Sequence, residues 1–323
     1  MSALVLGANG QDGSYLADVL LERGREVTGV ARQAQSRWVN HPRFHHVQLD
    51  LGDAETLARL LGEVHPDRIY ALAAVHGSAG FSYEPIWGAA LDVNLKSIHT
   101  CLEHIRTRNP AARLFLASSL KAFGDAPPAV IDEATPRVSS CLYGITKNAA
   151  ADLVAYYRAR HGVWACVGWL FNHDSPRRPG DYFLPRLTAQ LAAHLRGEPA
   201  TEPLMTLDFW CDWGSSLEFM TAAASLLDLD DPHDVVMASG APIHAATLAT
   251  ALSEAAGVEA GAWAKTLVEA PPRGAAAPPY RAKIDRLRQL VGAPASDGLD
   301  VALWILRERH GVDLQRPAGW ARS

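Results

Sequence analysis

The spacing of hydrophobic and polar positions changes between two periods along the first half of the chain. Short apolar or β-branched runs, typical of buried strands, lie at 3–6, 26–30, 46–49, 68–74 and 113–118. Amphipathic segments with helical spacing lie between or after them, at 15–23, 54–64, 89–108 and 143–161. Two further strands are expected at 163–170 and 235–239. Strands that alternate with helices predict an α/β fold, with a Rossmann-like, doubly wound and mostly parallel sheet.

The amino-acid composition of the chain changes after Leu170. Residues 172–212 are rich in Pro, Arg and His, with a helix expected at 184–196, and residues 270–280 form a Pro/Ala/Gly loop. We therefore expect a Rossmann domain formed by residues 1–171 and a strand near 233–240. A smaller C-terminal lobe, expected to bind substrate, would comprise residues 172–232 and 241–323.

Composition limits the classes of partner. The 323 residues carry a net charge of −5, which gives no reason to expect nucleic acid or an anionic membrane as partner. The four cysteines are far apart and form no CxxC pair, so we expect reduced, mostly buried thiols and no metal site. No apolar run reaches the roughly 20 residues that span a bilayer. We expect a cytoplasmic protein without a membrane segment.

A glycine-rich stretch, GANGQDG, follows the first predicted strand and precedes a predicted helix. This placement aims helix N–H groups and the helix dipole at a phosphate. Gly7 would allow the tight turn, Gly10 the close approach of a dinucleotide, and Gly13 close packing of helix on strand. The alternative is a glycine-rich turn without a ligand.

The second predicted strand ends in GVARQ, with Arg32 where an NAD site usually has an acidic residue. Because arginine suits a ribose 2′-phosphate, the sequence favours NADP over NAD. The alternative is that Arg32 is an ordinary surface charge.

The motif LYGITK places Tyr143 and Lys147 four residues apart at the start of a predicted helix. Residues with this spacing share one helical face, so both side chains can enter one pocket. A lysine beside a phenol lowers the phenol pKa, which makes Tyr143 usable as a base. A chance surface pair is the alternative.

These features resemble the extended short-chain dehydrogenase/reductases, and within them the GDP-mannose 4,6-dehydratases. The matching strings are GANGQDGSYLADVLLERG, PDRIYALAAV, LYGITK, LFNHDSPRR and DWG at 212–214, and the resemblance spans residues 2–240. It implies that Ser119 binds the sugar 4-hydroxyl and that Tyr143 takes its proton. It also implies a nucleoside diphosphate sugar as substrate and a homodimer or homotetramer.

The resemblance further implies which residues contact each ligand. The cofactor would contact Gly7, Asn9, Gly10, Gln11, Asp12, Gly13, Arg32, Asp50, Leu51, Leu72, Ala73, Ala74, Tyr143, Lys147, His173 and Arg178. The substrate would contact His76, Ser78, Asn172, Arg186 and Arg273. Two copies would pair through the helices at 89–108 and 143–161, with contacts at Leu91, Leu95, Ile98, Val154 and Tyr157. The alternative is that these five residues face their own sheet.

The sequence departs from the family in the expected active site. Where the family has Ser-Thr-Ser-Glu, this chain has Ser118-Ser119-Leu120-Lys121. Lys121 therefore replaces the carboxylate that takes the sugar C5 proton, and it could act as a base only with a strongly lowered pKa. Alternatively, Lys121 points to a phosphate or to solvent.

Two family cations near the nucleotide are also replaced, by Leu187 and within Trp210-Cys211, so GDP-mannose itself is not fixed as substrate. The main expectation is an NADP-dependent 4,6-dehydratase. A C4 epimerase or ketoreductase, which needs no second base, is the alternative. A non-catalytic NADP-binding protein is the third hypothesis.

Overall fold

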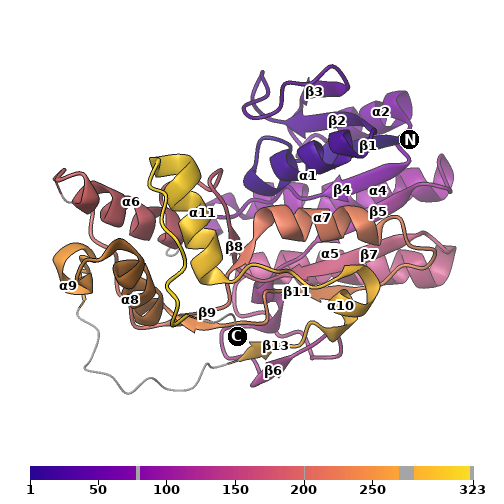
Figure 1. Cartoon of the computed structure of the whole chain (residues 1–323). Helices are drawn as coiled ribbons and strands as arrows, with labels where there is room; N and C mark the ends of the chain where they lie inside the picture. The colour runs from indigo at the N-terminus through magenta and orange to yellow at the C-terminus, as the bar shows by residue number, and fades with distance from the viewer. Residues whose placement is uncertain (78–80, 200, 269–279, 321–323) are drawn as a thin grey trace.

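A seven-stranded parallel sheet forms the centre of the computed structural model, which describes residues 1–77, 81–199, 201–268 and 280–320 (Figure 1). The strand order is β3-β2-β1-β4-β5-β7-β11, and every neighbouring pair is parallel. This confirms the predicted fold. The strands are β1 (Ser2–Leu6), β2 (Glu26–Ala31), β3 (Phe44–Gln48), β4 (Arg68–Ala71), β5 (Arg113–Ala117), β7 (Ala165–Leu170) and β11 (Val235–Met237).

Helices cover both faces of the sheet. One face carries α1 (Gln11–Glu22), α7 (Ser216–Leu226) and α10 (Asp285–Val291). The other carries α2 (Ala54–Val64), α4 (Ser97–Thr107) and α5 (Leu142–His161), and α3 (Trp87–Leu91) packs against α5. The chain reverses its direction of winding at β1, which lies between β2 and β4. In sheets of this kind, ligands bind beyond the carboxyl ends of the strands at that point.

The helix predicted at 89–108 is interrupted by a π-helical turn, η2 (Asp92–Lys96), between α3 and α4. The expectation that Ile98, Val154 and Tyr157 meet a second copy is wrong, because all three are buried in the chain's own core. Leu95 packs against the same core, and Leu91 is half-buried. The sheet therefore takes the apolar faces of α4 and α5 that were expected to meet a partner.

A second, smaller core lies to one side of the sheet. It is built from α6 (Phe183–Leu195), α8 (Ala245–Ala256), α9 (Ala260–Trp263) and α11 (Gly298–His310) (Figure 1). Helices α7 and α10 fall in the ranges predicted for the second lobe, yet they pack on the sheet beside α1 and β11. The apolar faces of α7 and α10 pack into the core beneath α1. The chain therefore passes between the two cores more often than the predicted domain boundaries imply.

Short elements complete the described residues. Two-residue strands pair as β8 (His173–Asp174) with β10 (Gly214–Ser215), β9 (Trp210–Cys211) with β12 (Ile243–His244), and β6 (Val130–Ile131) with β13 (Arg281–Ala282). Two 3₁₀ turns are η1 (Glu84–Ile86) and η3 (Leu120–Phe123). All four cysteines are unpaired and three are buried, as predicted. None of the helices in the described part of the chain combines the length and apolar character needed to cross a membrane.

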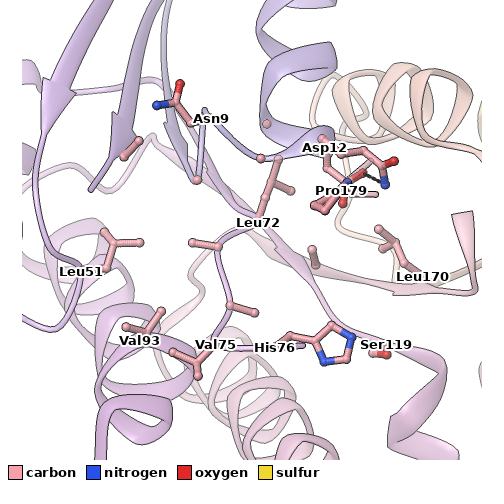
Figure 2. A pocket seen from close by; sticks show the side chains of 18 of the residues that line it. Asn9, Asp12, Leu51, Leu72, Val75, His76, Val93, Ser119, Leu170 and Pro179 are labelled. Atoms are coloured by element: carbon pink, nitrogen blue, oxygen red, sulfur yellow. Dashed lines mark hydrogen bonds between the residues drawn. The ribbon is translucent and has the colours of Figure 1, made fainter. Parts of the chain in front are cut away.

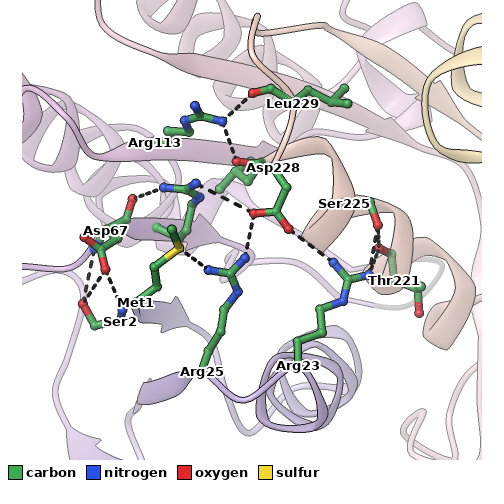
Figure 3. Close-up of polar contacts among 12 residues, drawn as sticks. Met1, Ser2, Arg23, Arg25, Asp67, Arg113, Thr221, Ser225, Asp228 and Leu229 are labelled. Atoms are coloured by element: carbon green, nitrogen blue, oxygen red, sulfur yellow. Dashed lines mark hydrogen bonds and ion pairs between the residues drawn. The ribbon is translucent and has the colours of Figure 1, made fainter.

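A cluster of arginines lies at the amino-terminal edge of the sheet, around Asp228 (Figure 3). The Asp228 carboxylate lies 2.7 Å from Arg25, 3.6 Å from Arg23 and 3.8 Å from Arg68. Arg113 donates to two backbone carbonyls on either side of Asp228. Since Arg68 and Arg113 begin β4 and β5, these contacts hold the segment after α7 to the start of two central strands.

Candidate active site

A cleft of about 660 Å³ opens at the carboxyl ends of the central strands. Figure 2 shows Asn9 toward one end of this cleft and His76 and Ser119 toward the other. The structure thus brings into one cavity residues that lie far apart in the sequence. Most of the predicted site residues line it: Gly7, Asn9, Gly10, Gln11, Asp12, Gly13, Arg32, Asp50, Leu51, Leu72, Ala73, Ala74, His76, Ser119, Tyr143, Lys147, Asn172, His173 and Arg178.

The glycine-rich loop has the shape that a dinucleotide requires. Gly7 has φ +98°, and a Cβ there would lie 3.0 Å from the backbone of Ala73. A Cβ on Gly13 would lie only 2.2 Å from the carbonyl oxygen of Gly7, so α1 can approach the loop this closely only with glycine. Gly10 precedes the first turn of α1, whose free N–H groups line the cleft. These features fit a diphosphate at the helix N-terminus.

Asn9 organises the end of the cleft at which Arg32 lies. Its Nδ2 donates to Gln33 Oε1 at 3.2 Å and to the Gln35 carbonyl at 2.9 Å, and its Oδ1 accepts from the Arg37 amide at 2.9 Å. Arg32 is exposed at the mouth of the cleft, and no described residue forms a hydrogen bond or ion pair with its guanidinium. A free cation held at this position can meet an anionic ligand group.

Asp12, on the first turn of α1, pairs with His173 of β8. His173 Nε2 lies 3.0 Å from each carboxylate oxygen, and Ser216 Oγ donates to Oδ1 at 2.7 Å. Burial favours a higher pKa for Asp12, but the charge and hydrogen bond of His173 and the Ser216 hydrogen bond lower it to about 2. Burial alone would lower the pKa of His173, yet Asp12 raises it above its usual value. Both residues were predicted as separate cofactor contacts; the ion pair between them was not.

Tyr143 and Lys147 are both buried on the first turns of α5, as the four-residue spacing predicted. Lys147 Nζ donates to the Ala117 carbonyl at 2.7 Å and lies 5.6 Å from the centre of the Tyr143 ring. Ser119 follows β5 and faces the same end of the cleft. The three residues predicted to handle the 4-hydroxyl therefore meet at one place.

The pKa of Tyr143 is raised, although the sequence predicted that Lys147 would lower it. Burial raises this pKa, the neighbouring Tyr83 raises it further, and a hydrogen bond with Ser119 lowers it. Burial also lowers the pKa of Lys147 to about 8, and Asp12 opposes that change. The nearby charge that lowers the pKa of Tyr143 is that of Arg178, whereas the charge of Lys147 was predicted to lower it.

The rings of His76, Tyr83 and Tyr143 form a stack for which the sequence has no signal. The His76 and Tyr143 rings lie 4.3 Å apart at 23°, and His76 Nδ1 lies 2.6 Å from the Tyr83 hydroxyl. Although part of His76 faces solvent along the cleft, burial of its ring and the charges of Arg178, Lys147 and Lys121 lower its pKa to about 4. His76 is therefore neutral at neutral pH.

Asn94 connects two of the segments that form this end of the cleft. It is buried on the π-helical turn η2, where its Oδ1 accepts from the Val75 amide at 2.7 Å and its Nδ2 donates to Thr146 Oγ1 at 3.1 Å. It thereby fixes the segment that carries His76 against the helix that carries Tyr143. The only sequence signal was a polar residue on the apolar side of a predicted helix.

Two of the predicted residues lie elsewhere. Lys121 is exposed on η3, does not line the cleft, and pairs with Asp125 at 2.8 Å. Arg186 donates to the Pro203 carbonyl at 2.7 Å and lies 3.7 Å from Glu202, also away from the cleft lining. Ser78 and Arg273 lie outside the described residues.

The lining residues that were not predicted include Tyr182, Phe81 and Ile86. The guanidinium of Arg178, which pairs with Asp174 at 3.1 Å, lies 3.6 Å above the ring of Tyr182. Phe81 and Ile86 contribute apolar surface to the cleft. These residues belong to irregular or short segments whose course depends on tertiary contacts. For Tyr182, the one sequence signal was an aromatic residue within the Pro- and Arg-rich segment 172–212.

Comparison with known proteins agrees with this geometry. The family model described as GDP-mannose 4,6 dehydratase matches residues 4–285. GDP-mannose 4,6-dehydratase of Vibrio cholerae is 33% identical over 254 residues, which are 74% of this chain and 67% of that protein. The enzyme of the same name from Yersinia enterocolitica is 32% identical over 273 residues, covering 80% and 72%.

Solved structures share the fold at lower identity. UDP-glucose 4-epimerase of Thermus thermophilus, in complex with NAD, has a TM-score of 0.76 at 22% identity, covering 95% of this chain and 99% of that one. dTDP-glucose 4,6-dehydratase of Bacillus anthracis, also in complex with NAD, has a TM-score of 0.72 at 16% identity, covering 95% and 97%. The chain therefore belongs to the GDP-mannose 4,6-dehydratase family, among the nucleotide-sugar dehydratases and epimerases of the short-chain dehydrogenase/reductase superfamily.

Proposed function

We propose that this protein is an NADP-dependent enzyme that oxidises a nucleoside diphosphate sugar at C4 and then removes water to give the 4-keto-6-deoxy sugar. The observation that carries the proposal is the meeting of Tyr143, Lys147 and Ser119 at one end of a cleft whose other end is a glycine-rich loop. The family membership of the chain supports a nucleotide sugar as substrate.

The residues at the end of the cleft formed by the glycine-rich loop fit a nicotinamide dinucleotide. The amides after Gly10 would bind its diphosphate, and Gly7 and Gly13 keep the space clear of side chains. Arg32 would meet a ribose 2′-phosphate, which favours NADP, whereas the two solved structures named above hold NAD. When bound, the nicotinamide supplies the hydride acceptor for C4 and the donor for C6.

The chain's own residues handle the proton and the orientation of the substrate. Ser119 holds the 4-hydroxyl, and Tyr143 takes its proton. Burial raises the pKa of Tyr143, so its phenolate needs a nearby positive charge, and the buried Lys147 ammonium lies 5.6 Å from the centre of its ring. From the predicted second lobe, Asn172 would contact the substrate and Arg178 the cofactor.

A second candidate is a C4 epimerase or ketoreductase. It is favoured by the position of Lys121, which pairs with Asp125 instead of entering the cleft where the family has its carboxylate base. Such an enzyme needs Tyr143, Lys147 and Ser119 but no group that removes the C5 proton. The epimerase and the dehydratase differ only after C4 has been oxidised, whereas a ketoreductase would transfer hydride from the reduced cofactor to a keto sugar.

Incubation of the purified protein with NADP and GDP-mannose, UDP-glucose, dTDP-glucose or CDP-glucose tests the proposal. A product lighter by one water, formed without net reduction of NADP because the hydride returns to C6, supports the dehydratase. An isomerised sugar of unchanged mass supports the epimerase. If no sugar reduces the cofactor or changes, the proposed function is wrong.

A further inference from the structure

We propose that His76 is the base that removes the sugar C5 proton, in the role first expected of Lys121. This inference rests on the proposed dehydratase function. His76 lies on the segment after β4, and its ring covers the ring of Tyr143 at 4.3 Å. In a hexose, C5 is bonded to C4, so the base for C5 must lie next to the residues that hold the 4-oxygen.

The contacts of His76 leave one nitrogen available to a substrate. Nδ1 lies 2.6 Å from the Tyr83 hydroxyl, and Nε2 has no hydrogen-bond partner among the described residues. When Nδ1 carries the proton and donates to Tyr83, the lone pair is on Nε2. The Tyr83 ring is also nearly parallel to that of Tyr143, at 16° and 6.0 Å, so the imidazole is held by two aromatic neighbours.

The electrostatic surroundings keep this imidazole in its basic form. Burial, followed by the charges of Arg178, Lys147 and Lys121, lowers the pKa of His76 to about 4. At neutral pH the ring is therefore uncharged and able to accept a proton. Arg178 and Lys147, which line the cleft, also favour the negative charge that develops on the 4-oxygen when the C5 proton leaves.

The described cleft offers no carboxylate for this role at the sugar end. Its two acidic lining residues are Asp12, which is bound to His173 and Ser216, and Asp50, whose Oδ1 accepts from the Gly52 amide. Asp12 belongs to the glycine-rich loop, and Asp50 follows β3, so both lie at the end of the cleft away from Ser119. Lys147 is bound to the Ala117 carbonyl, and Lys121 is paired with Asp125.

The step is an elimination without change in overall oxidation state. Nε2 of His76 takes the C5 proton, which the neighbouring 4-keto group makes acidic. The C–H electron pair forms the C5=C6 double bond, and the C6–O bond breaks with its electron pair on oxygen. The leaving oxygen takes a proton from the imidazolium and departs as water, which returns His76 to its neutral form.

Proton exchange in deuterated water separates this step from C4 oxidation. The full-length protein with NADP is mixed with whichever of the four nucleotide sugars the wild type oxidises. We expect His76→Gln to retain reduction of the nicotinamide within a few-fold, but to slow loss of water and deuterium incorporation at C5 by about 10²- to 10⁴-fold. His45→Gln, at an exposed position on β3, is the matched control and is expected to behave as wild type.

Two further variants distinguish a base from a structural residue. His76→Ala should regain part of its C5 exchange when free imidazole is added, which a packing defect would not do. Lys121→Ala should retain C5 exchange. NADP affinity and the melting temperature of each variant show that the fold is intact.

Each outcome decides between the proposals. Undiminished C5 exchange in His76→Gln, or its loss in Lys121→Ala alone, overturns the role of His76. Wild-type protein that oxidises a sugar without ever exchanging C5 overturns it as well and leaves only C4 chemistry. If no sugar is oxidised, the proposed function fails together with this inference, which is a distinguishable result.

Discussion

His173 and Asp12 form an ion pair that joins β8 to the first turn of α1, with Nε2 of the imidazole 3.0 Å from both carboxylate oxygens. The pair holds the glycine-rich loop against the strand end that faces it across the cleft. The shape of the phosphate site therefore depends on a contact between residues 161 positions apart.

The first prediction concerns the pH dependence of this pair. The pKa of Asp12 is lowered to about 2, so its contribution to stability is present above pH 4 and is lost as pH falls toward 2. The pKa of His173 is raised, so its contribution is present below pH 6.5 and is lost as pH rises through the raised value. Asp12→Asn should lower the free energy of unfolding by roughly 2 to 3 kcal/mol between pH 4 and 6.5, and by less outside this window. Thermal unfolding across pH measures the effect, with Asp181→Asn, at an exposed position, as control. An equal loss at every pH would contradict the ion pair.

The second prediction concerns the choice of cofactor. Because the Arg32 guanidinium is unpaired among the described residues, we expect NADP to bind at least about tenfold more tightly than NAD, or roughly 1.4 kcal/mol. Arg32→Asp should abolish or reverse the preference. Calorimetric titration with both cofactors measures this, and Arg59→Asp, on the exposed side of α2, controls for the change in net charge. Equal affinities in the wild type would show that Arg32 is only a surface charge.

The third prediction tests the close approach of α1 to the loop. Gly13→Ala places a Cβ about 2.2 Å from the Gly7 carbonyl, so the loop must shift, and we expect a destabilisation of about 1 to 3 kcal/mol and loss of cofactor binding. Gly62→Ala, inside α2 with no atom within 4 Å of the new Cβ, should instead stabilise the protein by about 0.5 to 1 kcal/mol. Chemical denaturation of both variants compares the same substitution in two helices. A Gly13→Ala protein that still binds cofactor as the wild type does would refute the packing argument.

The fourth prediction concerns Asp228. Removing its charge leaves three guanidinium groups near one another without their carboxylate, and one of them, Arg68, is buried. Asp228→Asn should therefore lower the melting temperature, most strongly at low ionic strength, because salt screens the remaining repulsion. Asp231→Asn, which removes a nearby exposed charge, should change little. A loss that does not depend on salt would point to packing instead of charge.

The fifth prediction concerns assembly, which we propose to be a homodimer through α4 and α5. The apolar residues first expected at this contact are buried, but Ile145 and Tyr156 on α5 are 45% and 55% exposed. Tyr156→Lys should shift the protein toward monomer in light scattering at micromolar concentration. Val130→Lys, at a position that is 55% exposed on β6, should not. Wild-type protein that is already monomeric would end this proposal.

Elements governed by a simple period were predictable from the sequence. Helix α2 occupies Ala54–Val64 as expected, because its apolar spacing is regular and Asp53 caps its first turn. Strand β4 was predicted to reach residue 74 but ends at Ala71, since residues 72–74 leave the sheet to line the cleft. An apolar run indicates that its residues are buried. Burial alone does not distinguish a strand of the sheet from an extended segment that lines a cleft.

The chemistry of the site was predictable only in part. Tyr143 and Lys147 followed from helical spacing, and the glycines from their place between a strand and a helix. The stack of His76 on Tyr143 depends on how the segment after β4 folds back over α5, for which the sequence has no local signal. The position of Lys121 could not be derived either. Lys121 lies on a short 3₁₀ turn, where it pairs with Asp125 in the loop that follows, and the sequence has no periodic pattern there that shows which way a side chain points.

The π-helical turn at Asp92–Lys96 makes this end of the site sensitive to chain length. A π-helical turn contains one residue more than an α-helical turn at the same place. Deleting a single residue from it would let an ordinary α-helix run from α3 into α4 with the two helices nearly in phase, but would change the place of Asn94 in that turn. The carboxamide of Asn94 would then leave Val75 and Thr146, and the segment carrying His76 would lose its anchor. A one-codon deletion could thus preserve the helix and the core while removing the catalytic geometry.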